Sequence, residues 1–330
     1  MNSQSPESRH AFTVTDLLIV LMLGAMLLAL GLPAVQQAKE DADRKTCEDN
    51  LRKLGEAFHL HARDQGGFPG RRNGYDITFK TYGGWGSNLL PYINLELAKD
   101  FDRDYDFFDP VNQKVSQTTI PTFVCPAAPR DRKTTVVSNA SGNSKNPDKD
   151  TTYTVHCGPN DYLASNGLFL PTAGYGAIIS EDMRARTHQA LTDNESMRLT
   201  EIVDGLSCTL LIIERAGSPQ TWHWNKRIDR PQQFALANNT RGTWAGWGSL
   251  FFGVYDGDDP TAPGRGDGND CAVNCNNFYG IYGFHEKGAN VLMCDGSVRF
   301  IGLKLNGLTL ARLTNRDDGQ LLADDDIAGE

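Results

Sequence analysis

An uninterrupted apolar run near the N-terminus, residues 17–32, constrains this chain of 330 residues more than any other feature. A helix that spans a bilayer needs about 20 predominantly apolar residues, and residues 12–35 reach that length with few polar interruptions. Ala29 and Gly31 could also be the exit of a cleaved secretory signal, but the apolar pattern continues past both. We therefore predict one membrane-spanning helical segment over residues 12–35.

The helical pattern continues over residues 36–64. Apolar residues recur there at spacings of four, three and four, which places them on one face of a helix: Cys47, Leu51, Leu54 and Phe58. Charged residues fill the other positions, and Gly66 and Gly67 end the pattern. The sequence predicts one long helix whose first half lies in lipid and whose second, amphipathic half packs on a domain.

Residues 65–316 read as a β-rich domain. Short apolar stretches are separated by turn-forming residues, which is typical of strands: TFVCP (122–126), CTLLIIE (208–214), SLFFGVY (249–255) and ANVLMCDGSVRFI (289–301). Polar segments 130–152 and 256–270 predict two long loops. The last segment, 317–330, holds six acids and no base and predicts a solvated acidic tail.

The charge distribution argues against a nucleic acid partner. The chain carries 32 basic and 41 acidic residues, and six of those acids lie in the tail. The remaining body is nearly neutral and has no basic stripe of the kind that follows a phosphate backbone.

Seven cysteines leave the disulfide connectivity open, and the odd count means that at least one has no partner within the chain. Cys271 and Cys275 form the one close pair. A C-x3-C pair without a second cysteine or histidine pair gives a zinc site little support. If the domain lies outside the cytoplasm, a disulfide between these two residues is the better interpretation.

Near the C-terminus the sequence predicts a β-hairpin. Residues 290–293 and 298–301 flank residues 294–297, and the Asp295-Gly296 pair favours a tight turn because both residues tolerate positive φ.

Residues 9–18 (RHAFTVTDLL) resemble the type IV prepilin signal, a basic leader followed by Gly-Phe-Thr-Leu-x-Glu-Leu-Leu. Ala11 stands where that family has Gly, and Asp16 stands where it has Glu. The resemblance implies that residues 1–11 are a leader, cleaved before Phe12 by a prepilin peptidase/methyltransferase that also methylates the new amine. It implies that the Asp16 carboxylate pairs with an amine in a growing filament. The implied partners are that enzyme, the lipid bilayer, and other pilin-like subunits bound through the N-terminal helix.

A second resemblance covers nearly the whole chain. His285, nine intervening residues and Asp295-Gly296 match the C-terminal signature of a large bacterial family that joins a prepilin-type cleavage and methylation segment to a domain of unknown function. Other segments resemble the same family in the same order: Gln36-Gln37-Ala38, Cys47-x2-Asn50-Leu51, Phe68-Pro69, Leu89-Leu90-Pro91-Tyr92, Phe123-Val124-Cys125-Pro126 and residues 204–214. The resemblance implies an α+β, pilin-like fold with a long N-terminal membrane-spanning helix packed on an antiparallel β-rich globular domain. It implies no reaction.

His285 and Asp295 have two interpretations. They could form an acid–base pair or bind a metal, or they could be structural, with His285 starting a turn and Asp295-Gly296 shaping the hairpin. The structural interpretation is the better one because no third ligand or nucleophile stands at a recognisable spacing. The chain also lacks a Gly-rich phosphate loop, HExxH and GxSxG. We predict no catalytic residue and no enzyme activity.

No cofactor is predicted apart from calcium as a candidate. The acidic loop fails the EF-hand pattern, whose sixth residue is Gly and twelfth is Glu. A calcium site of another kind could use its acids: Asp256, Asp258, Asp259, Asp267 and Asp270. Trp222 and Trp224 alternate as in a strand and would share a face, either as packing or as a flat sugar-binding surface.

These patterns lead to one expected function and one alternative. The expected function is a membrane-anchored, pseudopilin-like assembly subunit of a type II secretion or type IV pilus-like system. It would cross the inner membrane once, with its N-terminus cytoplasmic and its domain extracytoplasmic, and could reach the cell surface after assembly. The alternative is a membrane-anchored binding module for a glycan or peptide that never polymerises. Asp16 discriminates between the two, because only assembly requires it.

Overall fold

The computed structural model describes residues 14–74, 80–130, 132–142, 145, 151–168, 188–228, 242–262, 264, 268–320 and 322. The chain divides at residues 43 and 44 into two compact units. The helices are α1 (Val14–Gln65), α2 (Trp85–Ile93), α3 (Leu95–Asp100), α4 (Pro110–Ser116), α7 (Gly307–Thr314) and the 3-10 turns η1 (Pro121–Phe123) and η3 (Leu199–Glu201). The strands are β1 (Arg72–Asn73), β2 (Gly83–Gly84), β3 (Thr134–Asn139), β4 (Thr152–Cys157), β5 (Tyr162–Leu168), β6 (Leu210–Glu214), β7 (Thr221–His223), β8 (Lys226–Ile228), β9 (Ser249–Phe252), β10 (Tyr255–Asp256), β11 (Asp270–Cys271), β12 (Gly288–Met293) and β13 (Val298–Gly302).

Helix α1 confirms the predicted long helix over the residues that the structure describes. Its first part is strongly apolar: an 18-residue window has a mean hydropathy of 2.6, and none of that window is buried. In the described part of the chain, this is the one helix long and apolar enough to cross a membrane. From Cys47 onward the helix buries the predicted face, including Leu51, Leu54 and Phe58. A helix exposed and apolar at one end suits a single-pass or signal-anchored membrane protein.

A five-stranded sheet forms the centre of the domain, in the order β13-β12-β6-β5-β9. The first four strands pair antiparallel, and β9 adds to β5 in parallel at the edge. The predicted C-terminal hairpin is present as β12 and β13, with Leu292 opposite Val298. The fold is therefore α+β, as predicted, with a mostly antiparallel sheet.

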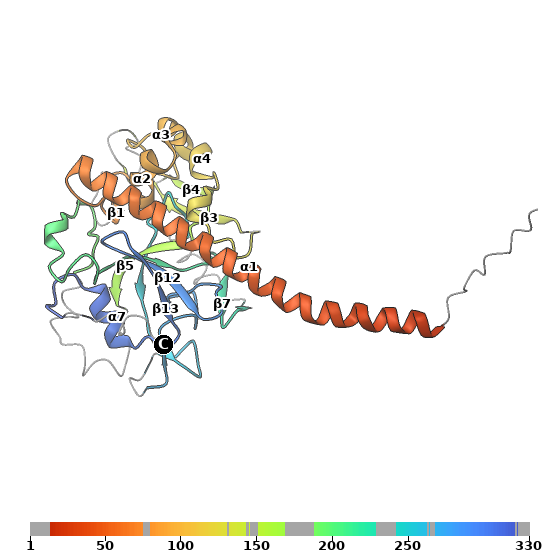
Figure 1. The fold of residues 1–330 in the computed structure, drawn as a ribbon. Helices are drawn as coiled ribbons and strands as arrows, with labels where there is room; N and C mark the ends of the chain where they lie inside the picture. Colours follow the sequence, from red (N-terminus) through yellow and green to blue (C-terminus); the bar gives the residue numbers. More distant parts are fainter. Residues whose placement is uncertain are drawn as a thin grey trace, which may run out of the picture. The chain divides into compact units, whose positions relative to one another are not determined.

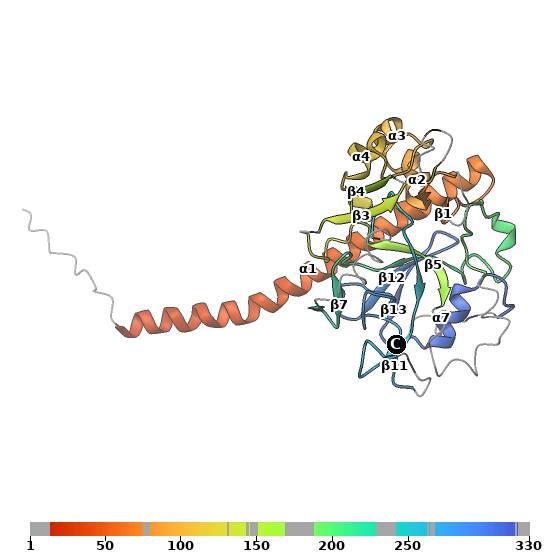
Figure 2. The same cartoon turned by 180° about the vertical axis from the view of Figure 1, so that it is seen from behind.

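Each face of the sheet covers its own hydrophobic core. Residues alternate between the two cores along a strand, so that Ile212 and Leu292 join Leu51 of α1 in one core. Ile213 and Val291 join the other core, which includes Leu310 and Leu313 of α7. Residues 44–65 of α1 cross the domain in Figure 1, and Figure 2 shows α7 beside β5. The sheet thus lies between two helical elements.

Two local predictions were wrong. The TFVCP stretch forms no strand: its first two residues lie in the 3-10 turn η1, which the preceding Pro121 starts at its first position. Strand β3 occupies part of the predicted loop 130–152 and pairs with β4. The first residues of the acidic segment lie against the domain, where the backbone N–H groups of Asp318 and Gly319 donate to the buried Asp204 carboxylate.

Candidate functional site

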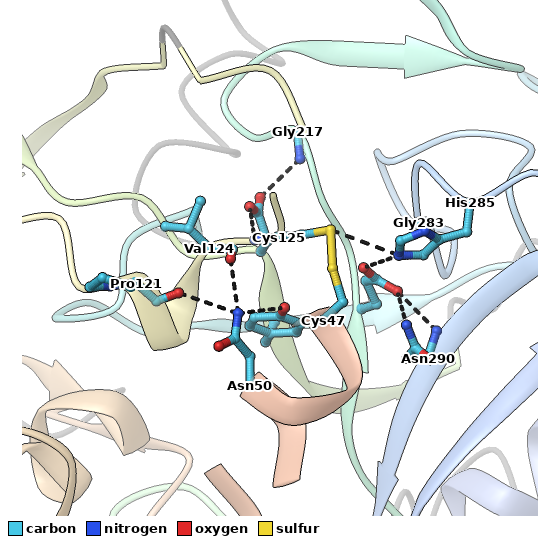
Figure 3. Close-up of a disulfide and its surroundings, with 12 residues drawn as sticks. Cys47, Asn50, Pro121, Val124, Cys125, Gly217, Gly283, His285 and Asn290 are labelled. Atoms are coloured by element: carbon cyan, nitrogen blue, oxygen red, sulfur yellow. Dashed lines mark hydrogen bonds and ion pairs between the residues drawn. A yellow bond between two sulfur atoms is a disulfide. The ribbon is translucent and has the colours of Figure 1, made fainter. Parts of the chain in front are cut away.

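Helix α1 is joined to the segment after α4 at two neighbouring positions on its buried face. Cys47 forms a disulfide with Cys125, with the two Cα atoms 5.3 Å apart. One turn further along, the Asn50 side-chain amide donates to the carbonyl oxygens of Pro121 (3.3 Å) and Val124 (3.1 Å). Figure 3 shows both attachments. The first turn of the helix that packs on the domain is therefore fixed covalently and by hydrogen bonds.

Beside this disulfide lies a buried carboxylate–imidazole pair. Glu214 ends the buried strand β6, and its Oε1 lies 3.2 Å from Nε2 of His285. Its Oε2 accepts hydrogen bonds from the backbone N–H (2.9 Å) and the side-chain amide (3.2 Å) of Asn290. The side chains of Glu214 and His285 are 0% and 1% exposed. A carboxylate this deep would be costly without donors, and here N–H groups face both of its oxygens.

His285 also reaches the disulfide, since its Nε2 lies 3.9 Å from Sγ of Cys125. Hydrogen bonds from the Asn274 side chain hold the backbone of His285 in place. The Asn274 side chain donates to the carbonyl oxygens of His285 (2.9 Å) and Gly288 (3.0 Å) from a left-handed backbone conformation with φ of 63°. Asn274 lies inside the short loop that the Cys271–Cys275 disulfide closes.

A buried ion pair between Arg132 and Asp161 supports the other side of Cys125. The Arg132 guanidinium binds Asp161 through two hydrogen bonds, of 2.5 and 2.6 Å. The Asp161 carboxylate also accepts from the backbone N–H of Cys125 (2.9 Å) and Gly217 (3.0 Å). Next to it, burial together with the nearby Glu214 carboxylate raises the pKa of Tyr162 well above its ordinary value. The phenol therefore stays neutral.

We refer to Cys47, Cys125, Glu214 and His285 as the buried cluster. One ligand-type atom from each of these residues lies within 4.8 Å of the corresponding atoms of the other three. All four residues are buried. The cluster offers a disulfide, an imidazole and a carboxylate in mutual contact, and solvent does not reach it.

The predicted signature residues separate in the structure. His285 belongs to the buried cluster, whereas Asp295 is exposed in the hairpin turn, where its carboxylate accepts from the backbone N–H (2.8 Å) and hydroxyl (2.6 Å) of Ser297. Gly296 follows with φ of 86°. The ring of His285 therefore has Glu214 as its polar partner, where the sequence suggested a pair with Asp295.

The N-terminal predictions fall partly outside the described structure. Ala11 and Phe12 lie outside the described residues. Asp16 lies in the first turn of α1, and its side chain is exposed.

The acids proposed as calcium ligands lie in and around the connection between β10 and β11. Asp267 lies outside the described residues. Of the other candidate acids, Asp258 accepts a hydrogen bond from the side chain of Asn269 (3.0 Å) through its carboxylate. Asp259 accepts from the backbone N–H and the hydroxyl of Thr261. Asp256 and Asp270 pair across β10 and β11.

The two tryptophans do not share a face. Trp222 packs edge-on against Phe284, with ring centroids 5.0 Å apart. Trp224 follows β7 with φ of 42° and is 45% exposed. The left-handed residue ends the strand, so the alternation expected from the sequence stops before Trp224.

A polar hollow of about 290 Å³ lies near the end of α1. His61, Lys80, Arg103, Asn88 and Glu195 contribute to its lining. Burial lowers the pKa of Arg103 and also that of His61, whose Nδ1 lies 2.9 Å from the carbonyl oxygen of Gly67.

Sequence reasoning placed Glu214, Cys47 and Cys125 in segments that resemble a family, but it did not assign them to a site. A usable signal was present at Glu214. It follows four consecutive apolar residues in a strand that is buried throughout, and a carboxylate in such a position requires hydrogen-bonding partners. Asn50 and Asn290 carried no comparable signal, because asparagines are common in turns and on surfaces.

Comparison with known proteins gives one match. A family described as "Protein of unknown function (DUF1559)" matches residues 36–305. No curated protein and no solved structure matches the chain. The matched region begins within α1 and includes Cys47, Cys125, Glu214 and His285. Because the match covers most of its length, the chain belongs to the DUF1559 family.

Proposed function

We propose that this protein is a membrane-anchored, pseudopilin-like assembly subunit of a type II secretion or type IV pilus-like system. One observation carries the proposal: α1 is exposed and apolar in its N-terminal part and buried on one face from Cys47 onward. An exposed apolar helix needs lipid or the helices of other subunits around it. A subunit that stands in the membrane and then joins a filament needs both environments in turn.

The attachment of α1 to the domain supports this role. The Cys47–Cys125 disulfide and the Asn50 hydrogen bonds lie at the start of the buried part of the helix. A load applied along the apolar segment would reach the domain at this covalent joint. An assembly subunit benefits from such a joint, because its helix must not peel away from the domain during extraction from the membrane.

The proposal includes processing and orientation. Residues 1–11 act as a cytoplasmic leader, a prepilin peptidase/methyltransferase cleaves before Phe12, and the domain lies outside the cytoplasm. The support is the resemblance of residues 9–18 to a prepilin signal, together with the two disulfides of the domain, which persist in oxidising compartments. Intact mass of the protein from its native membrane should show a chain that begins with methylated Phe12. A chain that retains Met1, or one cut near Gly31, would contradict this part.

Assembly is tested at Asp16. Asp16→Ala should abolish multimers captured by cross-linking in cells, because the apolar segment then lacks its one carboxylate. The melting temperature and the disulfides should stay unchanged, because no part of the apolar window is buried in the domain. Asp41→Ala is the matched control: it removes an exposed carboxylate from the same helix, outside the apolar segment, and should leave the multimers intact.

The polar hollow near His61 favours the second candidate function, a binding module for a glycan or peptide that does not polymerise. Its lining of amide, cationic and carboxylate side chains suits a hydroxylated or charged ligand. Under this alternative, Asp16→Ala changes neither the cross-linking pattern nor ligand binding. An unchanged pattern in cells that express the whole secretion system would therefore favour the binding module.

A further inference from the structure

The buried cluster combines two sulfur atoms, an imidazole nitrogen and a carboxylate oxygen within 4.8 Å of one another. We propose that the dithiol form of the protein binds one zinc ion through Cys47, Cys125, His285 and Glu214, and that the Cys47–Cys125 disulfide is the alternative, metal-free state of the same site. The proposal does not depend on the assembly function.

The donor set fits zinc in both type and number. Zinc favours four ligands in a tetrahedron, drawn from thiolate, imidazole and carboxylate, at about 2.0–2.3 Å from the metal. Ligand atoms around such an ion therefore lie about 3.3–3.8 Å apart. His285 Nε2 already lies 3.9 Å from Sγ of Cys125 and 3.2 Å from Oε1 of Glu214. Once the sulfur–sulfur bond is broken, small rotations of the two cysteine side chains suffice to complete the tetrahedron.

The surroundings hold three of the ligands in position. Asn290 binds Oε2 of Glu214 twice and leaves Oε1 facing His285. Asn274 fixes the backbone of His285. Asp161 fixes the backbone N–H of Cys125. Hydrogen bonds of this kind, made to the ligands by residues that do not touch the metal, typically raise metal affinity.

The two states differ by a balanced redox step. A dithiol reductant supplies two electrons and two protons to the disulfide, which gives two thiols and an oxidised reductant. Zinc then releases the two thiol protons to solvent, and the proton on His285 Nε2 moves to Nδ1, because the metal binds thiolates and the unprotonated nitrogen of a neutral imidazole. In the reverse step a disulfide oxidant takes two electrons from the two thiolates and, with two protons, becomes a dithiol, while the sulfur–sulfur bond re-forms and the ion is released. Zinc and the disulfide therefore exclude each other.

The test uses the full-length chain in detergent, with Cys271→Ser and Cys275→Ser so that the other disulfide contributes no thiols. The chain is reduced with a phosphine under argon, dialysed, and titrated with Co²⁺ and then Zn²⁺. We expect a sulfur-to-cobalt charge-transfer band and the visible bands of tetrahedral cobalt, both lost when about one equivalent of Zn²⁺ is added. The oxidised chain should show neither band. Native tryptophan fluorescence should persist in the metal-bound form.

Further substitutions in the same background assign the ligands. Cys47→Ser with Cys125→Ser should abolish the charge-transfer band while leaving Cys157, Cys208 and Cys294 in place as internal controls. Glu214→Gln and His285→Gln should each weaken zinc affinity by at least about 10-fold. The proposal is overturned if the reduced parent chain gives no cobalt bands or gives them only after losing its native fluorescence. It is equally overturned if the oxidised chain binds as well, or if the bands survive the removal of Cys47 and Cys125.

Discussion

At Gly296 the backbone conformation of a single residue determines the hairpin. The sequence correctly predicted the position of the turn, but the class of turn differs from the one expected. Within the turn, residues 294–297, only Gly296 has a positive φ (86°). Its N–H donates to the carbonyl oxygen of Met293 at 3.0 Å. This is the longer hairpin connection, in which a turn is followed by one left-handed residue. Asp-Gly fits both classes, so the dipeptide could not distinguish between them.

Gly296→Val should destabilise the domain by about 1–3 kcal/mol, because a β-branched residue is strained at positive φ. A Cβ at this position would meet the ring of His59 at an ordinary contact distance of 3.4 Å, so the cost is conformational. Gly296→Asn should therefore cost less than Gly296→Val, since asparagine tolerates this region. Thermal unfolding of both variants measures the difference. Equal losses would show that contact with His59 dominates instead.

The stability of the domain should depend on pH through His61, and the direction of this dependence follows from the shift in the pKa of His61. Burial lowers the pKa of His61 below its ordinary value, and the hydrogen bond with Gly67 only partly offsets this. The unfolded chain therefore binds a proton more readily, so His61 contributes stability above about pH 6.5 and that contribution is lost as the pH falls. His61→Gln should reduce the drop in unfolding midpoint between pH 7.5 and pH 5.5. A variant with the same drop as the parent would refute this.

At the scale of elements, regular periodicity was predictable and long-range proximity was not. The face Cys47-Leu51-Leu54-Phe58 and the β12–β13 hairpin follow directly from their 3.6- and 2-residue patterns. The short TFVCP run is too brief for either period, and Pro121 gave it a helical turn. The buried cluster combines residues of α1, of the segment just after η1, of β6 and of the connection before β12. Pairing cysteines 78 residues apart is a property of packing, and no local pattern encodes it.

The two disulfides should differ in what they contribute to stability. Cys47–Cys125 closes a loop with a sequence separation of 78, and Cys271–Cys275 one of 4. By lowering the conformational entropy of the unfolded chain, the longer loop should stabilise the folded state by about 4–5 kcal/mol and the shorter one by about 2 kcal/mol. Replacing the first pair by serines should therefore lower the denaturant midpoint clearly more than replacing the second. A larger loss from the second pair would mean that holding Asn274 and His285 in place outweighs loop closure.

At the scale of the whole molecule, the division at residues 43 and 44 separates the part of α1 that needs lipid from the part that builds the core. The buried residues of α1 run from Cys47 to His61. The large exposed apolar residues of α1 lie between Val14 and Val35, apart from Leu60. The sequence predicted this arrangement, because the apolar run and the amphipathic face are both local patterns. Helix α1 therefore serves two environments with two separate stretches of residues.

A chain that begins at Arg44 should fold as the full chain does but leave the membrane. Arg44 itself remains, with its guanidinium 5.1 Å from the ring centre of Phe300. We expect this truncated chain in the soluble fraction, with the Cys47–Cys125 disulfide formed and a melting temperature within about 2 °C of the full chain in detergent, equivalent to less than about 1 kcal/mol. A chain that begins at Gly66 is the matched control. It lacks the buried face of α1, including the half-cystine Cys47, and should fail to fold, because deleting even one buried leucine of that face costs about 2–5 kcal/mol. If the Arg44 chain instead melted well below the full chain, or remained with the membranes, then residues 14–43 would contribute to the domain, and the division of labour along α1 would be wrong.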